Sequence, residues 1–329
     1  MYIKFLKAGG GDSILIKDNS HNILIDGGND SSFLLSEIDD IRNKGEVIEL
    51  IFITHHDDDH IKGIEDLLKH IESHSPQKII KQIFFNSPRL IKDTFKNIDD
   101  SFLSYKQAYE VEELIKQLNL PVKCCTDQTP TIKCGKIDIH ILSPTQEHLK
   151  KYSSAKGAYL TNDNRCDWKE SLFELEKSLD DDSLDSDIAN ESSIVVNIKY
   201  DNKNILLTGD VTPKRFNEII DKMYKDNKNK PVPFDLIKLP HHGSYRNLSK
   251  NILDKIKCQK FVITTNGKNN FLPNKRALLK ILKYIQREQE QEIEFFFNYE
   301  EVLDYLKITA KERKYYNFKL TPIKELSWL

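Results

Sequence analysis

The feature that most constrains the fold is a set of short apolar segments that each stop at polar residues. Residues 50–53 are wholly apolar, and the run 54–60 (Thr-His-His-Asp-Asp-Asp-His) follows at once. Two later, mainly apolar segments, 204–208 and 235–239, also lead into Asp or His. Short apolar runs bounded by turn residues are typical of buried β-strands. The pattern therefore predicts several strands whose ends carry polar side chains.

Strand and helix signals alternate along both halves of the chain. In the first half we expect strands over 2–7, 13–17, 21–26, 50–53 and 78–85, helices over 32–43, 64–71 and 104–118, and a hairpin over 132–142. In the second half we expect strands over 193–200, 204–208, 235–239, 260–265 and 292–297, and helices over 213–224, 248–256 and 275–287. Two strand-rich halves with helices after strands predict an α/β (α+β) fold, with two packed sheets flanked by helices in four layers.

The length of 329 residues allows one large domain or two ordinary ones. We expect a single domain over 1–329, with a polar insertion at about 145–190 and a C-terminal extension from about 290. Inside the insertion we predict a helix over 168–179 and a solvated acidic loop over 180–187. This acidic run lacks the Gly and the terminal Glu of a calcium-binding loop.

Composition excludes some classes of protein. The formal net charge of -2 gives no overall attraction to nucleic acid. The N-terminal apolar stretch is too short for a signal peptide, and no run is long enough to span a bilayer. The five cysteines are irregularly spaced, which favours reduced thiols and a cytoplasmic location.

Potential metal ligands occur at three of the predicted strand ends. They are His55, Asp57, Asp59 and His60 in the first group, Asp210 in the second, and His241 or His242 in the third. Imidazole nitrogens and carboxylate oxygens bind zinc, manganese and iron. Side chains two apart in an extended segment point the same way, so His55 and Asp57 can bind one ion while Asp59 and His60 turn to a second. Asp210 has two carboxylate oxygens and could bridge both ions.

The alternative interpretation of the run 54–60 is an acid-rich surface turn, because Asp and His are common in loops. Asp210 and the pair His241-His242 follow other apolar strands, which an acidic turn does not predict. Together the three groups favour a metal site.

With these motifs in order, the chain resembles a metallo-β-lactamase-fold hydrolase, specifically of the soluble ComEC-type branch associated with DNA uptake. The matching segments are residues 9–16, 24–28, 54–63, 190–193, 206–210 and 236–244. The resemblance extends from residue 1 to about residue 275. It implies a four-layer αββα fold with two mixed sheets, and a hydrolase that uses one or two divalent ions, Zn or Mn.

The resemblance also implies roles for individual residues. The metal ligands would be His55, Asp57, Asp59, His60, Asp210 and His242. The catalytic residues would be Asp59, Asp210 and His241, with His241 facing the substrate or supporting a ligand; the sequence leaves open which of His241 and His242 binds metal. Residues behind the ligands or beside the substrate would be Asp12, Asp26, Asn190 and Ser244. Asp26 matches a residue that braces the loops without touching metal.

Two departures from the superfamily bear on the metal. The superfamily usually has His in place of Asp57, although the ComEC-type branch shares the Asp. Another His is common near residue 190, where this chain has Asn190. The first metal site is therefore expected to be short of a nitrogen ligand and richer in oxygen, which favours manganese or weaker zinc binding.

The leading hypothesis is a phosphodiesterase or nuclease in which a metal-bound hydroxide attacks phosphorus while His241 or Ser244 assists the leaving group. The phosphodiester assignment, with DNA or a nucleotide as substrate, rests on the resemblance alone. A second hypothesis is hydrolysis of a carboxylic ester, lactone or amide. A third is a non-catalytic binding or regulatory subunit with a degenerate metal site, acting with a protein partner in a multi-component system.

For several other residues we favour a structural role over a functional one. His56 and Asp58 are expected to face away from their neighbours in the run. Trp168 and Phe173 are expected to be packed side chains rather than a substrate wall. The basic and aromatic stretch 311–319 is interpreted as a solvated edge strand or as a surface that stacks on nucleic acid.

Overall fold

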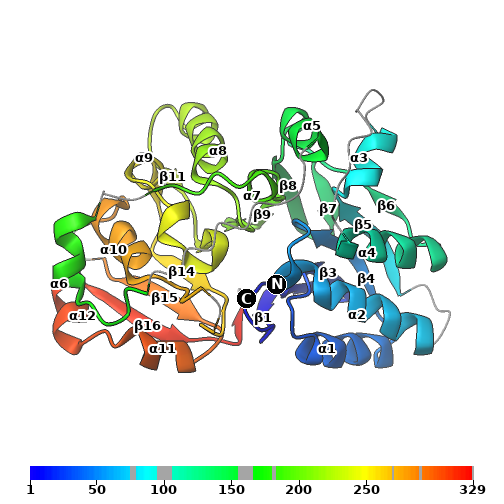
Figure 1. Cartoon of the computed structure of the whole chain (residues 1–329), viewed down its shortest axis with the longest axis horizontal. Helices are drawn as coiled ribbons and strands as arrows, with labels where there is room; N and C mark the ends of the chain where they lie inside the picture. Colours follow the sequence, from blue (N-terminus) through cyan, green and yellow to red (C-terminus); the bar gives the residue numbers. More distant parts are fainter. Residues whose placement is uncertain are drawn as a thin grey trace.

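Two large β-sheets dominate the computed structural model, which describes residues 1–74, 79–94, 106–154, 166–179, 183–268, 270–288 and 291–327. The N-terminal half of the chain builds one sheet and the C-terminal half builds most of the other (Figure 1). Helices lie on the outer sides of both sheets (Figure 1). No helix within the described ranges is long and apolar enough to cross a membrane.

The first sheet has the strand order β17-β1-β2-β3-β4-β5-β6. Its strands are β1 (Tyr2–Phe5), β2 (Ile14–Asp18), β3 (His21–Ile25), β4 (Val47–Ile53), β5 (Ile80–Phe85), β6 (Val122–Lys123) and β17 (Glu325–Ser327). The pairs from β17 to β3 are antiparallel, and those from β3 to β6 are parallel. The sheet is therefore mixed, and its parallel strands direct their carboxyl ends to one edge.

The second sheet has the order β16-β15-β14-β12-β10-β9-β8-β7. Its strands are β7 (Ile132–Cys134), β8 (Ile137–Ser143), β9 (Val195–Tyr200), β10 (Lys203–Leu207), β12 (Leu236–Lys238), β14 (Lys260–Ile263), β15 (Ile293–Phe297) and β16 (Phe318–Pro322). The pairs from β7 to β10 are antiparallel, and those from β10 to β16 are parallel. A separate small sheet joins β11 (Val232–Pro233) to β13 (Ile256–Lys257).

Helices cover the outer face of each sheet. Those of the first half are α1 (Ser32–Asn43), α2 (Asp58–His74), α3 (Pro88–Thr94), α4 (Lys106–Gln117) and α5 (Gln146–Ser154). Those of the second half are α6 (Leu172–Leu175), α7 (Ile188–Glu191), α8 (Pro213–Asp226), α9 (Lys250–Leu253), α10 (Lys275–Tyr284), α11 (Glu301–Leu306) and α12 (Ala310–Tyr316). The apolar stripes of α1, α2 and α4 pack on the first sheet, and those of α8, α9 and α10 pack on the second.

A third apolar layer fills the space between the two sheets. Ile16, Ile23 and Phe52 contribute to it from the first sheet, and Ile198 and Val262 from the second. Alternate residues of β4 point to opposite sides, so that Phe52 faces this layer while its neighbours in the strand face the helices. The predicted four-layer arrangement of two mixed sheets between helices is confirmed.

Several predicted boundaries differ from the structure. The helix expected at 64–71 begins at Asp58, because the carboxylates of its first turn favour a helix N-terminus. The helix expected over 168–179 is reduced to α6 and a short 3-10 turn (Glu176–Ser178), since Ser171 caps it. The helix expected over 248–256 ends at Leu253, because Ile256 pairs with Val232 in the small sheet.

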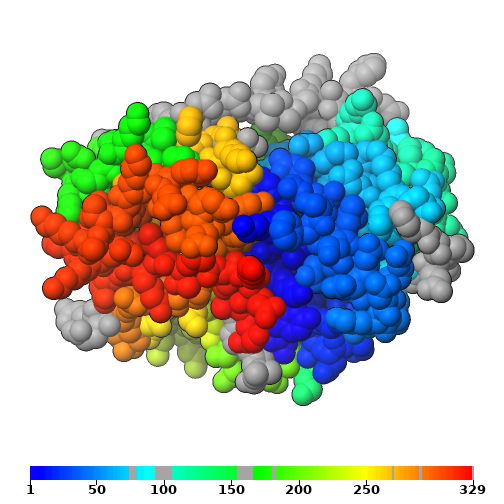
Figure 2. Space-filling model, turned by 90° about the horizontal axis from the view of Figure 1, so that it is seen from below, coloured from blue at the N-terminus to red at the C-terminus, as the bar shows by residue number. Residues whose placement is uncertain are grey.

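The C-terminal segment was only partly anticipated. Most of the stretch 311–319 forms α12, which starts at the capping box of Thr309 and Glu312, rather than the expected edge strand. After α12, β16 does form the edge of the second sheet. The last strand, β17, pairs with β1, so the two ends of the described chain lie side by side (Figure 2). The single-domain boundaries, the insertion at 145–190 and the extension from 290 stay predictions.

Replacing Phe52 by Ala should test the layer between the sheets. Phe52 is fully buried and stacks on Phe84 with ring centroids 5.0 Å apart. The cavity should lower the free energy of unfolding by about 3–5 kcal/mol, measured by urea denaturation. Phe33→Ala is the control, because Phe33 is 52% exposed and its loss should change stability by less than about 0.5 kcal/mol. Equal unfolding midpoints for the two variants would contradict this packing.

Candidate metal centre

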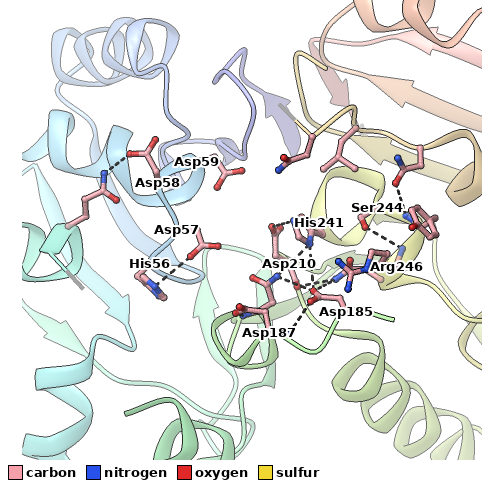
Figure 3. Close-up of a pocket in the computed structure, with 17 residues that line it drawn as sticks. His56, Asp57, Asp58, Asp59, Asp185, Asp187, Asp210, His241, Ser244 and Arg246 are labelled. Atoms are coloured by element: carbon pink, nitrogen blue, oxygen red, sulfur yellow. Dashed lines mark hydrogen bonds and ion pairs between the residues drawn. The ribbon is translucent and has the colours of Figure 1, made fainter. Parts of the chain in front are cut away.

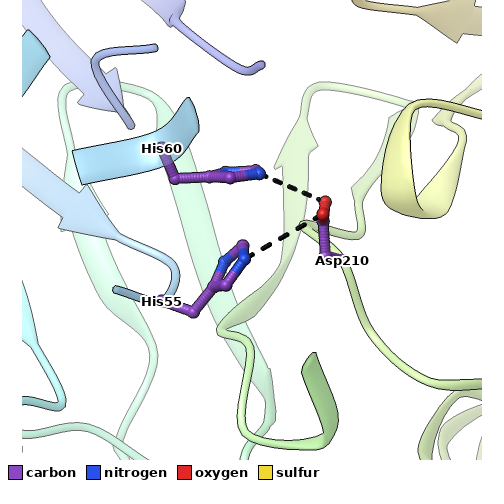
Figure 4. Close-up of side chains that lie close together, drawn as sticks. All are labelled: His55, His60 and Asp210. Carbon is purple, nitrogen blue, oxygen red and sulfur yellow. Dashed lines mark ion pairs between the residues drawn. The ribbon is translucent and has the colours of Figure 1, made fainter. Parts of the chain in front are cut away.

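Three strand ends bring His and Asp side chains together at one edge of the two sheets. His55 follows β4, His60 lies in the first turn of α2, and Asp210 follows β10. The Nε2 atom of His60 lies 3.3 Å from Oδ1 of Asp210, and Nε2 of His55 lies 3.9 Å from Oδ2 (Figure 4). All three side chains are buried. The structure therefore joins both halves of the sequence at one carboxylate.

A second group of donors surrounds His242, which follows β12. Its Nε2 atom lies 3.3 Å from Nε2 of His60, 3.2 Å from Oδ2 of Asp59 and 3.5 Å from Oδ2 of Asp210. The Nδ1 atom of His242 donates to the backbone oxygen of Thr264 at 2.8 Å, with the tautomer set by this contact. That bond leaves Nε2 for the cluster, as in metal-binding histidines.

The donors on the other side of Asp210 are fewer. Oδ2 of Asp57 lies 3.5 Å from Nε2 of His55 and Oδ1 lies 3.6 Å from Nε2 of His56. His55 lies beside the carboxylates of Asp57 and Asp210, and the ring of His60 is also close to it, with centroids 4.1 Å apart. The expected shortage of nitrogen at the first metal site stays a prediction.

The chemistry of the cluster fits a divalent cation. Nε2 of His55 and Oδ1 of Asp210 are buried without a hydrogen-bond partner, which is costly for polar atoms. Burial lowers the pKa of His60 and His242, yet Asp210 and the other nearby carboxylates outweigh burial and hold both pKa values well above their usual range. The site therefore favours positive charge near the two facing imidazoles, and a metal ion bound there would supply that charge.

Asp26 holds the loop that carries the donors. It follows β3 with a φ of 57°, and its Oδ1 accepts a hydrogen bond of 2.7 Å from the backbone N–H of Thr54. Its Oδ2 accepts one of 2.6 Å from the Thr54 hydroxyl and lies 2.8 Å from Nδ1 of His60. A carboxylate behind a histidine fixes the ring and leaves the far nitrogen for metal. This geometry agrees with the bracing role expected for Asp26.

The sequence analysis missed Lys238, whose side chain is fully buried beside the cluster. Its Nζ forms an ion pair with Asp12, donates to the backbone oxygen of Gly209 at 3.2 Å and lies 3.8 Å from Oδ1 of Asp210. Burial lowers the pKa of Lys238, but Asp12 and Asp210 outweigh burial and raise it, so the amine stays charged. Asp12 also accepts a hydrogen bond from Thr264, and its Oδ1 lies 3.4 Å from Nδ1 of His242.

The available signal for Lys238 was a single charge inside the otherwise apolar strand 236–239. A lysine within a buried parallel strand needs a partner. Asp12, which the sequence placed near the metals, is that partner.

Asp185 was also missed, because the acidic run 180–187 was expected to be a solvated loop. In its described part, residues 183–187, Asp185 is buried and faces the cluster. Its Oδ2 accepts hydrogen bonds from Asn190 at 3.0 Å and Asn247 at 2.9 Å, and lies 3.7 Å from Nδ1 of His241. Burial raises the pKa of Asp185, but His241 and Asn190 outweigh burial and lower it to about 2. The carboxylate is therefore ionised.

A cavity of 360 Å³ opens onto the donors (Figure 3). Its lining residues are His56, Asp57, Asp58, Asp59, Gln107, Asp185, Asp187, Asn190, Asp210, His241, Ser244, Tyr245, Arg246, Asn247, Asn270, Leu272 and Asn274. His56 and Asp58 thus contact this cavity, which corrects the expectation that they face away. His56 bonds through Nδ1 to the Tyr152 hydroxyl at 2.8 Å, and Asp58 accepts from Gln107 at its outer rim.

Trp168 and Phe173, which were expected to be packed side chains and not a substrate wall, are packed. Trp168 stacks on Tyr305 with ring centroids 5.4 Å apart. Phe173 contacts Tyr316, with ring centroids 5.6 Å apart. Both lie against the core outside the second sheet.

Comparisons with known protein families and solved structures show which proteins this chain resembles. The family model described as Metallo-beta-lactamase superfamily matches residues 6–75, a range that contains Asp12, Asp26 and the run 54–60. A comparison with curated protein sequences gave no match.

Solved structures similar to the whole chain include three proteins. They are the metallo-beta-lactamase fold protein YhfI from Bacillus subtilis (9% identity, TM-score 0.43, 99% of both chains covered), Zn²⁺-bound PqqB from Methylobacterium extorquens (10%, 0.47, 100% of both) and the short form of human tRNase Z (13%, 0.44, 99% of both). Similarity at this level carries no information on substrate.

Two mixed sheets packed between helices, with a buried cluster of His and Asp at the strand ends, define a metallo-beta-lactamase fold with a candidate metal centre. The match to the Metallo-beta-lactamase superfamily model covers residues 6–75 of this chain.

Asp26→Asn should weaken metal binding without removing a ligand. The amide cannot hold the proton on Nδ1 of His60 as a carboxylate does, so affinity should fall by about 10- to 100-fold. Competition with a fluorescent chelator measures the change. Asp201→Asn is the control, because Asp201 is an exposed turn residue at a φ of 51° that Asn tolerates. Wild-type affinity in Asp26→Asn would contradict the bracing role.

Lys238→Met should destabilise the metal-free protein. It leaves Asp12 buried without its counter-charge, so the free energy of unfolding should fall by about 3–5 kcal/mol in the presence of chelator. Lys133→Met removes an exposed pair with Asp138 and should cost less than about 1 kcal/mol. Urea denaturation of both variants makes the comparison, and equal losses would show that Lys238 has no special electrostatic role.

Proposed function

We propose that this protein is a metal-dependent hydrolase that cleaves a phosphodiester, in DNA or in a nucleotide. The observation that carries the proposal is the convergence of His55, Asp57, Asp59, His60, Asp210 and His242 in one cluster. The three carboxylates of this cluster line the cavity. Nε2 of His55 and Oδ1 of Asp210 are buried without a hydrogen-bond partner, which supports a cation there.

The donors form two groups that share Asp210. Asp59, His60 and His242 would hold one ion, and His55 and Asp57 would hold another. Zn and Mn both accept mixed imidazole and carboxylate donors, and we propose one or two such ions. When bound, they would lower the pKa of a water molecule and neutralise charge on the substrate.

Residues of the opposite wall would act on the substrate. Arg246 supplies the one lysine or arginine side chain among the described residues that line the cavity, and a guanidinium binds phosphate oxygens well. Ser244 is buried on the same wall, where its hydroxyl can donate to the leaving oxygen. His241 lines the cavity as well, but it lies beside the donors, between Asp185 and Asp210. A cation and hydroxyl facing the metal donors favour an anionic substrate over a neutral ester, lactone or amide.

We also propose that the chain belongs to the ComEC-type branch of the superfamily. The support is Asp57 at a position where other members usually have His, together with the segment His241-His242-Gly243-Ser244. If the centre binds metal without turning over substrate, the better proposal is a regulatory subunit that acts with a protein partner.

Asp210→Ala should abolish activity, because it removes the carboxylate shared by both donor groups. We expect the variant to lose its metal, measured by inductively coupled plasma mass spectrometry. Turnover of bis(p-nitrophenyl) phosphate and of single-stranded DNA should fall by about 10²-fold or more. Asp201→Asn is the surface control, because Asp201 is exposed and Asn tolerates its φ of 51°.

Three results would overturn parts of the proposal. A wild-type protein free of transition metal would remove its basis. Turnover of p-nitrophenyl acetate or a lactone, but of neither phosphodiester, would establish the ester, lactone or amide hypothesis instead. Bound metal with no turnover of any of these substrates would favour the regulatory subunit.

A further inference from the structure

The ring of His60 lies near two other imidazoles, with centroid distances of 4.1 Å to His55 and 5.2 Å to His242. The Nε2 atoms of His60 and His242 are 3.3 Å apart, and if these two rings bind one ion, His55 is left as the imidazole beside Asp57. Asn190, expected near a common histidine position of the superfamily, has an amide oxygen that is buried without a hydrogen-bond partner. Its Nδ2 atom donates to Asp185 and lies 3.5 Å from Nδ1 of His241. The imidazole next to Asn190 is therefore that of His241.

His241 approaches the same carboxylate oxygen as His55. Its Nε2 atom lies 3.8 Å from Oδ2 of Asp210, and the Nε2 atom of His55 lies 3.9 Å from that oxygen. In Figure 3, His241 is drawn beside Asp210 on the wall of the cavity, with Asp185 next to both. The side chain is 30% exposed, so it faces the cavity and not the core.

Asp185 stands behind His241 as Asp26 stands behind His60. Oδ2 of Asp185 lies 3.7 Å from Nδ1 of His241, and Asn190 and Asn247 hold this carboxylate in place through hydrogen bonds. A carboxylate on the Nδ1 side of a histidine orients Nε2 toward a metal. This arrangement prepares His241 for the role of a ligand.

The backbone explains how two consecutive histidines both reach the cluster. In a strand, neighbouring side chains point to opposite faces, and in a helix they diverge by about 100°. Here His241 and His242 both adopt the left-handed region, with φ of 47° and 53°. Non-glycine residues are strained in this region, and strain of this kind is concentrated at functional sites. As a result both rings flank Asp210, at 83° to each other.

From these contacts we infer that the adjacent histidines divide between two ions. His242 binds with Asp59 and His60, and His241 binds with His55 and Asp57, supplying the nitrogen that Asn190 does not. Asp210 bridges the two sites. Each ion then has two imidazoles and two carboxylates, so the first site is no weaker in nitrogen than the second. The inference rests on the metal binding of the proposed function and is independent of the substrate.

Metal stoichiometry tests this inference directly. Apo-protein is loaded with Zn²⁺, dialysed and analysed by native mass spectrometry. We expect two ions in the wild type, one in His241→Ala and one in His242→Ala. In Asn190→His with His241→Ala, a histidine returns to the usual superfamily position and should restore the second ion. Circular dichroism establishes that each variant is folded, and His241→Gln replaces His241→Ala if the alanine variant is not.

The outcomes separate this inference from the proposed function. Two ions of wild-type affinity in His241→Ala, or a single ion in the wild type, would overturn the division of the histidines while leaving the metallohydrolase intact. An absence of metal from the wild type would overturn both. X-ray absorption of the zinc-loaded wild type should give two histidines per zinc, and a lower average would contradict the proposed ligand set.

Discussion

The structure depends on the burial of several carboxylates in one small volume at the sheet edges. Asp12, Asp26 and Asp210 are each almost fully buried there. Burying a charge without a partner is costly, and within the described residues Lys238 supplies the fixed cation of this cluster. One ammonium group does not balance this charge, which is why the pKa values of His60 and His242 are held high. A divalent cation bound there would also balance the negative charge of these buried carboxylates. The same carboxylates would therefore determine both the stability of the fold and the binding of metal.

The architecture makes this concentration of charge possible. Parallel strands of both sheets end at the same edge, which places residues after β4, β10 and β12 within a few ångströms of each other. Apolar side chains of both sheets form the core between them, and the donor side chains lie where the strands stop. Asp26 and Asp185 then act from behind the donor loops, each on the Nδ1 side of a histidine. The fold positions the donor loops, and the carboxylates of Asp26 and Asp185 orient the histidine rings.

Much of this could be predicted from the sequence, and what could not has a physical reason. The strand before His55, and the places of Asp210 and the pair His241-His242 after strands, follow from apolar runs that stop at polar residues. The start of α2 was placed too late, because three acidic residues resemble a loop until their place at a helix N-terminus is known. Asp185 and Lys238 were missed because their partners lie far away in the sequence. Local sequence patterns identify candidate metal donors. The residues that hold these donors in place, such as Lys238 and Asp185, are recognised only from tertiary contacts.

The central claim is that the strand ends form a metal centre with two ions around Asp210. Crystals grown with zinc, measured above and below the zinc absorption edge, test it most directly through anomalous difference maps. The account predicts two peaks about 3.5–4 Å apart. One should lie among His55, Asp57 and Asp210, and the other among Asp59, His60 and His242. No peak at Asp210, or zinc bound only elsewhere on the surface, would contradict it.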